Sequence, residues 1–139
     1  MAKLKIGLWA ALVLLVTLGA GWLWGARGRW AAETQARDTA LRLSLAEARA
    51  ALSGARVDLF ELNFGQASRD LEHAKKALNA CAGRFDQAGP PEAAAAVRDA
   101  LAKAGEGQQL AGSVDQGANA RVAEALKALD RATGSLTAR

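Results

Sequence analysis

Apolar residues fall along this chain in two patterns, an unbroken run near the N-terminus and a helical repeat after it. The run extends from Ile6 to Ala26, twenty-one positions without a charged side chain. A helix of that length spans about 31 Å, close to the hydrocarbon core of a bilayer. The pattern therefore predicts a transmembrane helix.

The residues around this run are typical of a membrane boundary. Lys3 and Lys5 precede it, and Arg27 and Arg29 follow it. Tryptophan rings gather near its far end, where headgroups meet the hydrocarbon core. The side chains assigned to the span are Ile6, Trp9, Leu15, Gly21, Trp22, Trp24 and Gly25. Two of these glycines also have the four-residue spacing that lets membrane helices pair closely.

A heptad repeat follows, in which apolar positions alternate steps of three and four. This spacing is typical of helices that pack through one face. Its members, called here the first seam, are Leu41, Leu45, Ala48, Leu52, Ala55, Leu59 and Leu62. The leucines of the seam, Leu41, Leu45, Leu52, Leu59 and Leu62, are the predicted interface for self-association.

A second seam begins one residue out of phase with the first. Its members are Phe60, Phe64, Ala67, Leu71, Ala74, Leu78, Cys81 and Phe85. Residues 30–85 contain no proline and are rich in helix formers, which predicts one long helix or two nearly collinear ones. The phase change has the form of a stutter, so we expect a kink or short break at Asn63–Gly65.

Gly89-Pro90-Pro91 is the strongest break in the chain, because proline cannot continue a helix. We expect the chain to reverse there and a third helix to run from Pro91 to Ala111. After a turn at 112–116, where Ser113 and Gln116 have capping-box spacing, a fourth helix is expected from Gln116 to Ala132. This packing would bury the second seam and leave the first uncovered.

The predicted fold is all-α, an N-terminal transmembrane helix followed by a long helical stalk and a small helical bundle. The expected divisions are a signal anchor at 1–26, a coiled-coil-like stalk at 27–59, a bundle at 60–134 and a frayed tail at 135–139. An Ala-rich core buries little area per residue, which favours self-association.

Charge and composition bear on location and partners. The chain has 18 Lys+Arg against 14 Asp+Glu, without the basic run that nucleic-acid binding requires. Abundant alanine, and arginine in excess of lysine, indicate a bacterial source. The basic start favours a cytoplasmic N-terminus and places the helical domain outside the cytoplasmic membrane. The expected partners are the lipid bilayer and either a second copy or another envelope protein.

Residues that could carry chemistry are sparse. His73 and Cys81 are the only histidine and cysteine, and they lie about 80° apart around a helix. No disulfide can form within the chain, and we predict no metal, cofactor or enzymatic activity.

The leading hypothesis is therefore a single-pass anchor, scaffold or accessory subunit. One alternative is an exported soluble bundle after leader cleavage, although cuts after Ala20 or Ala26 would place a large residue, Leu18 or Trp24, at the −3 position. The other is a ligand-binding or enzymatic helical domain.

Overall fold

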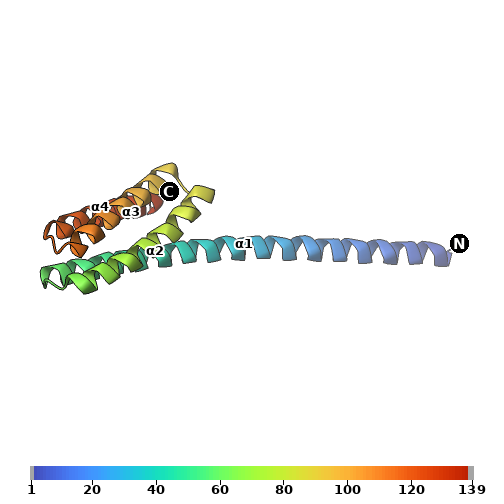
Figure 1. Ribbon diagram of the computed structural model, residues 1–139. Helices are drawn as coiled ribbons and strands as arrows, with labels where there is room; N and C mark the ends of the chain where they lie inside the picture. The colour runs from blue at the N-terminus through green and yellow to red at the C-terminus, as the bar shows by residue number, and fades with distance from the viewer. Residues whose placement is uncertain (1, 138–139) are drawn as a thin grey trace. The chain divides into compact units, whose positions relative to one another are not determined.

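The computed structural model describes the backbone of residues 2–137 and the side chains of residues 17, 32–87 and 89–136. It contains four helices, α1 (Ala2–Phe60), α2 (Phe64–Ala88), α3 (Pro91–Gly112) and α4 (Gly117–Thr137), shown in Figure 1. The described backbone contains no strand, so the all-α prediction is confirmed. The chain divides into two compact units, Met1–Thr39 and Ala40–Arg139.

The predicted membrane span lies within the first unit. Its backbone belongs to α1, but its side chains, apart from Thr17, lie outside the described residues. The same holds for each side chain assigned to the span: Ile6, Trp9, Leu15, Gly21, Trp22, Trp24 and Gly25. Where the structure does describe the residues, no helix combines the length and the apolar character needed to cross a bilayer.

The second unit is an up-and-down four-helix bundle. Its first helix is the part of α1 from Ala40 onward, followed by α2, α3 and α4. The three connections are two to four residues long, so each helix runs antiparallel to the next. The first and last helices of the bundle are also neighbours, and Arg49 of α1 forms an ion pair with Asp130 of α4.

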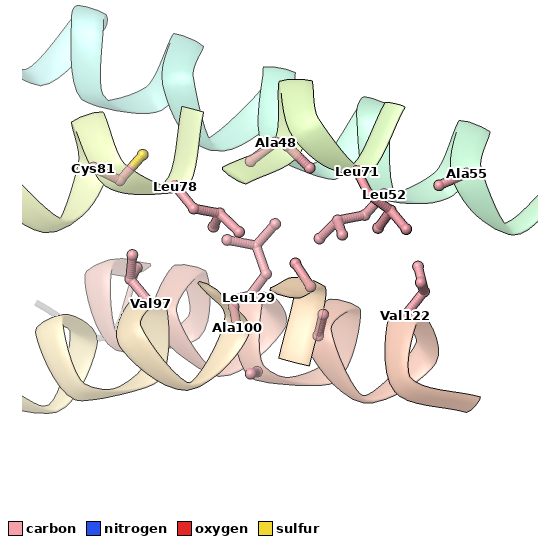
Figure 2. Close-up of a cluster of buried hydrophobic side chains, with 14 of the residues drawn as sticks. Ala48, Leu52, Ala55, Leu71, Leu78, Cys81, Val97, Ala100, Val122 and Leu129 are labelled. Carbon is pink, nitrogen blue, oxygen red and sulfur yellow. The ribbon is translucent and has the colours of Figure 1, made fainter. Parts of the chain in front are cut away.

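Both heptad seams are buried in this one core. Figure 2 shows Leu52 of α1 and Leu71 of α2 facing Val122 and Leu129 of α4 across the bundle. The fully buried side chains are mostly alanines and leucines, spaced three and four residues apart on each helix. Such small side chains let the helix backbones approach closely.

The expectation that the first seam stays uncovered is therefore wrong. Leu45, Leu52 and Leu59 are each at most 5% exposed. The reason is that α4 packs beside α1, an arrangement that the sequence pattern of α1 alone does not reveal. Residues 40–59, expected to form part of a separate stalk, instead belong to the bundle.

The break between the seams is a full reversal of the chain, not a kink in a straight stalk. The Asn63 N–H donates to the Asp58 carbonyl at 2.7 Å, and the Leu62 N–H donates to the Leu59 carbonyl at 3.2 Å. This pair of bonds is a Schellman motif, with Leu62 in the left-handed position at φ 60°. Asn63 then caps α2 by accepting from the Gln66 N–H.

The other two turns agree with expectation in part. The reversal before Pro91 is confirmed, with Pro90 as N-cap and Glu92 in the first turn of α3. At the α3–α4 turn the expected Ser113–Gln116 capping box does not form. Instead the Asp115 carboxylate accepts from the Gly117 N–H at 2.7 Å. Helix α4 continues to Thr137, five residues beyond its predicted end at Ala132.

Candidate functional site

The five predicted interface leucines are divided by the fold. Leu45, Leu52 and Leu59 lie inside the bundle core, where they already contact the same chain. Leu41 is partly buried against that core. Leu62 is 61% exposed at the α1–α2 turn. Because three of the five are covered, self-association along the whole first seam would require the bundle to open.

The apolar surface of α1 lies on a different face from the first seam. Leu43, Val57 and Phe60 are between 56% and 69% exposed and follow one another at heptad-compatible steps. The heptad pattern placed Phe60 in the second seam, and Leu43 and Val57 belong to neither seam. The sequence does contain a pattern that marks these residues. Each lies two positions before a leucine of the first seam, so the three residues keep the heptad spacing of that seam on another face of the helix.

The phenylalanines of the second seam likewise take different environments. Phe85 is buried beside the α2–α3 turn, and its ring lies against the Gly89 backbone, where a Cβ atom would come within 2.3 Å of it. Phe64 packs at the edge of the core. Phe60 lies at the surface, with the Arg56 guanidinium over its ring at 5.8 Å. Only Phe60 is therefore available to another molecule.

A groove of about 570 Å³ lies between α1 and α4. Leu45 and Leu129 belong to its lining and to the core, while Arg42 and Arg49 line it as exposed side chains. Arg49 is held across the groove by its ion pair with Asp130. The described lining combines apolar side chains with the two arginines, one of them paired with Asp130.

His73 and Cys81 do not form a joint site. His73 is exposed on α2 and lines a shallow groove of about 420 Å³ with Glu47 and Lys76. Cys81 is fully buried, and burial raises the pKa of its thiol to about 11. The thiol therefore stays protonated at neutral pH and is a poor nucleophile.

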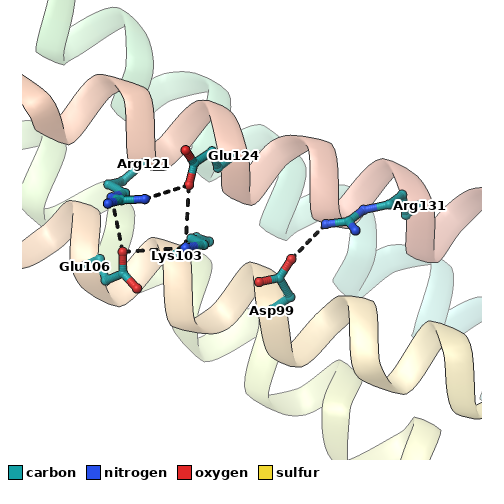
Figure 3. A network of polar contacts seen from close by, with 6 residues as sticks. All are labelled: Asp99, Lys103, Glu106, Arg121, Glu124 and Arg131. Carbon is teal, nitrogen blue, oxygen red and sulfur yellow. Dashed lines mark hydrogen bonds and ion pairs between the residues drawn. The ribbon is translucent and has the colours of Figure 1, made fainter.

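Polar side chains along the α3–α4 surface form an ion-pair network, shown in Figure 3. Arg121 bridges Glu124 at 2.9 Å and Glu106 at 3.1 Å, and Lys103 lies 3.6 Å from Glu124. The hydrogen bond from Arg121 is the main cause that lowers the pKa of Glu124. Beneath the network, a Cβ atom at Gly107 would lie 3.0 Å from Val122, so this glycine permits close approach of the two helices.

A second polar cluster joins α2 to α3. Gln108 donates to the Glu72 carboxylate at 3.1 Å and accepts from Lys75 at 2.8 Å. The hydrogen bond from Gln108 is the largest cause that lowers the pKa of Glu72. Both polar clusters connect neighbouring helices of one bundle, which is a structural role. No group of three or more potential metal ligands occurs among the described residues.

Comparison with known proteins adds no relative. No protein family, curated protein or solved structure matches the chain.

Proposed function

We propose that this protein is a single-pass membrane anchor that presents a four-helix bundle for protein–protein contact, as a scaffold or accessory subunit that self-associates. The observation that carries the proposal is the uncharged run Ile6–Ala26, bracketed by basic residues and with tryptophans gathered near its far end. A bilayer is the solvent that such a run prefers.

The structure of the bundle is compatible with this role. Helix α1 continues from the uncharged run into the bundle without a break in its backbone, since it extends from Ala2 to Phe60. The polar clusters of the bundle connect one helix to the next, and the exposed apolar side chains of α1 remain available for contact. We place the anchor in the bacterial cytoplasmic membrane.

Membrane extraction of the full chain tests the anchor. We expect the protein to remain in the pellet after high-salt and carbonate washes, because salt screens surface charge but does not remove a buried span. Leu15→Lys together with Val16→Lys should release it, since a lysine near the centre of a span costs about 3 kcal/mol. Leu15→Ala with Val16→Ala is the matched control and should remain bound.

Intact mass separates the anchor from the exported alternative. The anchored chain keeps its full mass of 14.4 kDa. Recovery of the parent protein in the soluble fraction, at full mass or shortened by the leader, would reject the anchor.

A further inference from the structure

Helix α1 carries an uncharged stripe on the face opposite its buried one. We call it the outer face of α1, and its six exposed members are Leu43, Ala46, Ala50, Ser53, Val57 and Phe60. Their steps are 3, 4, 3, 4 and 3, which is the a/d pattern of a coiled coil. Because α1 already packs in the bundle through the first seam, the heptad pattern of the outer face is not needed for the fold of the single chain.

Each of the other helices of the bundle has charged residues among its exposed positions. Arg69 and Lys76 lie on α2, Glu106 on α3 and Lys127 on α4, all exposed. Exposed charge keeps a helix face solvated. The outer face of α1 has no such charge over 18 residues, and three of its six members are large apolar side chains.

The charges beside the outer face are arranged by sign. With Leu43 at an a position, the g positions are Arg42, Arg49 and Arg56, and the e positions include Glu47 and Glu61. In a parallel coiled coil in register, each g residue faces the e residue five positions later in the other helix. That geometry places Arg42 opposite Glu47 and Arg56 opposite Glu61, with the Arg56 Nε–H also donating to the Asn119 side-chain oxygen of its own chain at 3.1 Å.

The third basic position, Arg49, has no charged partner in this register. The e position that would face Arg49 is Gly54, which offers no charge. Arg49 pairs instead with Asp130 of its own chain. In an antiparallel pair, by contrast, g would face g and arginine would meet arginine, which disfavours that orientation.

We propose that the outer face of α1 binds the outer face of a second copy of this chain, in parallel and in register. This inference deepens the self-association in the proposed function by naming its surface and orientation. A parallel pair directs both N-terminal segments the same way, which two anchors in one bilayer require.

The composition of the outer face sets the strength of the pairing. Alanine and serine in the middle let the two helices approach closely but bury little apolar area. The stripe is also shorter than three heptads. The pairing is therefore weak for dilute protein and becomes favourable where both copies are concentrated on one membrane.

Disulfide trapping in cells that express the full chain tests the proposal. Val57→Cys, in a Cys81→Ala background that removes the native thiol, places identical a positions opposite each other. We expect mild oxidation to give a covalent species of twice the chain mass. Ala102→Cys, on the exposed surface of α3, is the matched control and should stay monomeric.

Orientation and surface are tested by four further variants. In an antiparallel pair, position 46 of one chain would face position 57 of the other. A crosslink in a mixture of Ala46→Cys and Val57→Cys chains, without one in Val57→Cys chains alone, would therefore overturn the proposal. Leu43→Asp should abolish the Val57→Cys dimer while leaving helicity unchanged. Arg42→Glu should reduce the crosslinked fraction by about fivefold, the effect of two exposed ion pairs. Adding Glu47→Arg to it should restore the yield.

Crosslinking is scored separately in the membrane and soluble fractions, so that it does not depend on the anchor. A Val57→Cys dimer in the soluble fraction would support the interface while rejecting the anchor. Absence of the dimer from both fractions, or a crosslink to a different protein, would overturn the interface and leave the anchor intact. An undiminished dimer in the Leu43→Asp variant would also overturn it.

Discussion

Two residues of the bundle adopt a backbone conformation that glycine normally supplies. Leu62 has φ 60° and Val114 has φ 58°, and both side chains are more than 60% exposed. Val114 lies two residues beyond the end of α3, as Leu62 lies two residues beyond the end of α1, and the Asp115 N–H donates to the Leu110 carbonyl at 2.9 Å. Left-handed backbone is unfavourable for a residue with a Cβ atom, and most of all for a β-branched one.

Replacing either residue by glycine should stabilise the bundle. Leu62→Gly removes the clash of the Cβ atom at φ 60° and gives up little burial, so we expect a gain of about 1 kcal/mol in the free energy of unfolding. Val114→Gly should gain at least as much. Leu62→Ala is the control that retains the Cβ atom and should gain nothing. Thermal unfolding followed by circular dichroism measures all three, and equal values for the glycine and alanine variants would contradict the strain.

A pair of carboxyl groups brings a pH-dependent cost to the α1–α2 hairpin. Desolvation, followed by repulsion from Asp70, raises the pKa of Asp58 above 3.8. The folded chain therefore holds this proton more tightly than the unfolded chain, and its stability falls as pH rises through the raised pKa. Gly54 contributes to the close approach, because a Cβ atom there would lie 2.7 Å from the Asp70 carboxylate.

Asp70→Asn should therefore stabilise the protein at neutral pH. Asparagine keeps the shape of the side chain and an oxygen that can accept from Gln66, but it removes the negative charge facing Asp58. The difference from the parent should shrink as pH falls through the raised pKa of Asp58, because protonated Asp58 carries no charge for Asp70 to repel. Melting curves between pH 3 and pH 8 measure this effect. A variant less stable than the parent at pH 7 would show that the negative charge of Asp70 is favourable overall.

At the scale of elements, the sequence predicted the helices better than their pairing. The three–four spacing correctly grouped Leu45, Leu52 and Leu59 on one face of α1, but that face was expected to stay uncovered and is buried. Pro91 correctly marked the start of α3. A one-residue phase change, however, fits a stutter in a straight coil and a turn between antiparallel helices equally well. At Leu62 no glycine or proline indicated which of the two would form.

The candidate surface was missed for a related physical reason. Ala46, Ala50 and Ser53 are too small to stand out as a hydrophobic seam, and they belong to a helix that already has a stronger one. Which face of α1 remains exposed depends on α4, whose residues follow more than fifty positions later in the chain. Only the closed bundle distinguishes the face used for folding from the face left for a partner.

At the scale of the whole molecule, the proposed anchor has a testable orientation, which is the side of the membrane on which the bundle would lie. Lys3 and Lys5 favour a cytoplasmic start of the span, whereas Arg27 and Arg29 favour the opposite orientation. We propose the first orientation, which places the bundle outside the cytoplasm.

Labelling from outside the cell decides the orientation. Cys81 is buried with a raised thiol pKa, so the native chain should react slowly with maleimides. Ala102→Cys in the Cys81→Ala background places one thiol on the exposed surface of α3. In spheroplasts, a membrane-impermeant maleimide should label this variant as fully as it does after lysis. Replacing Lys3 and Lys5 by neutral residues leaves positively charged side chains only after the span. This change should invert the orientation and prevent labelling before lysis, because positive charge sets the orientation of the span. Labelling of the Ala102→Cys chain only after lysis would place the bundle in the cytoplasm.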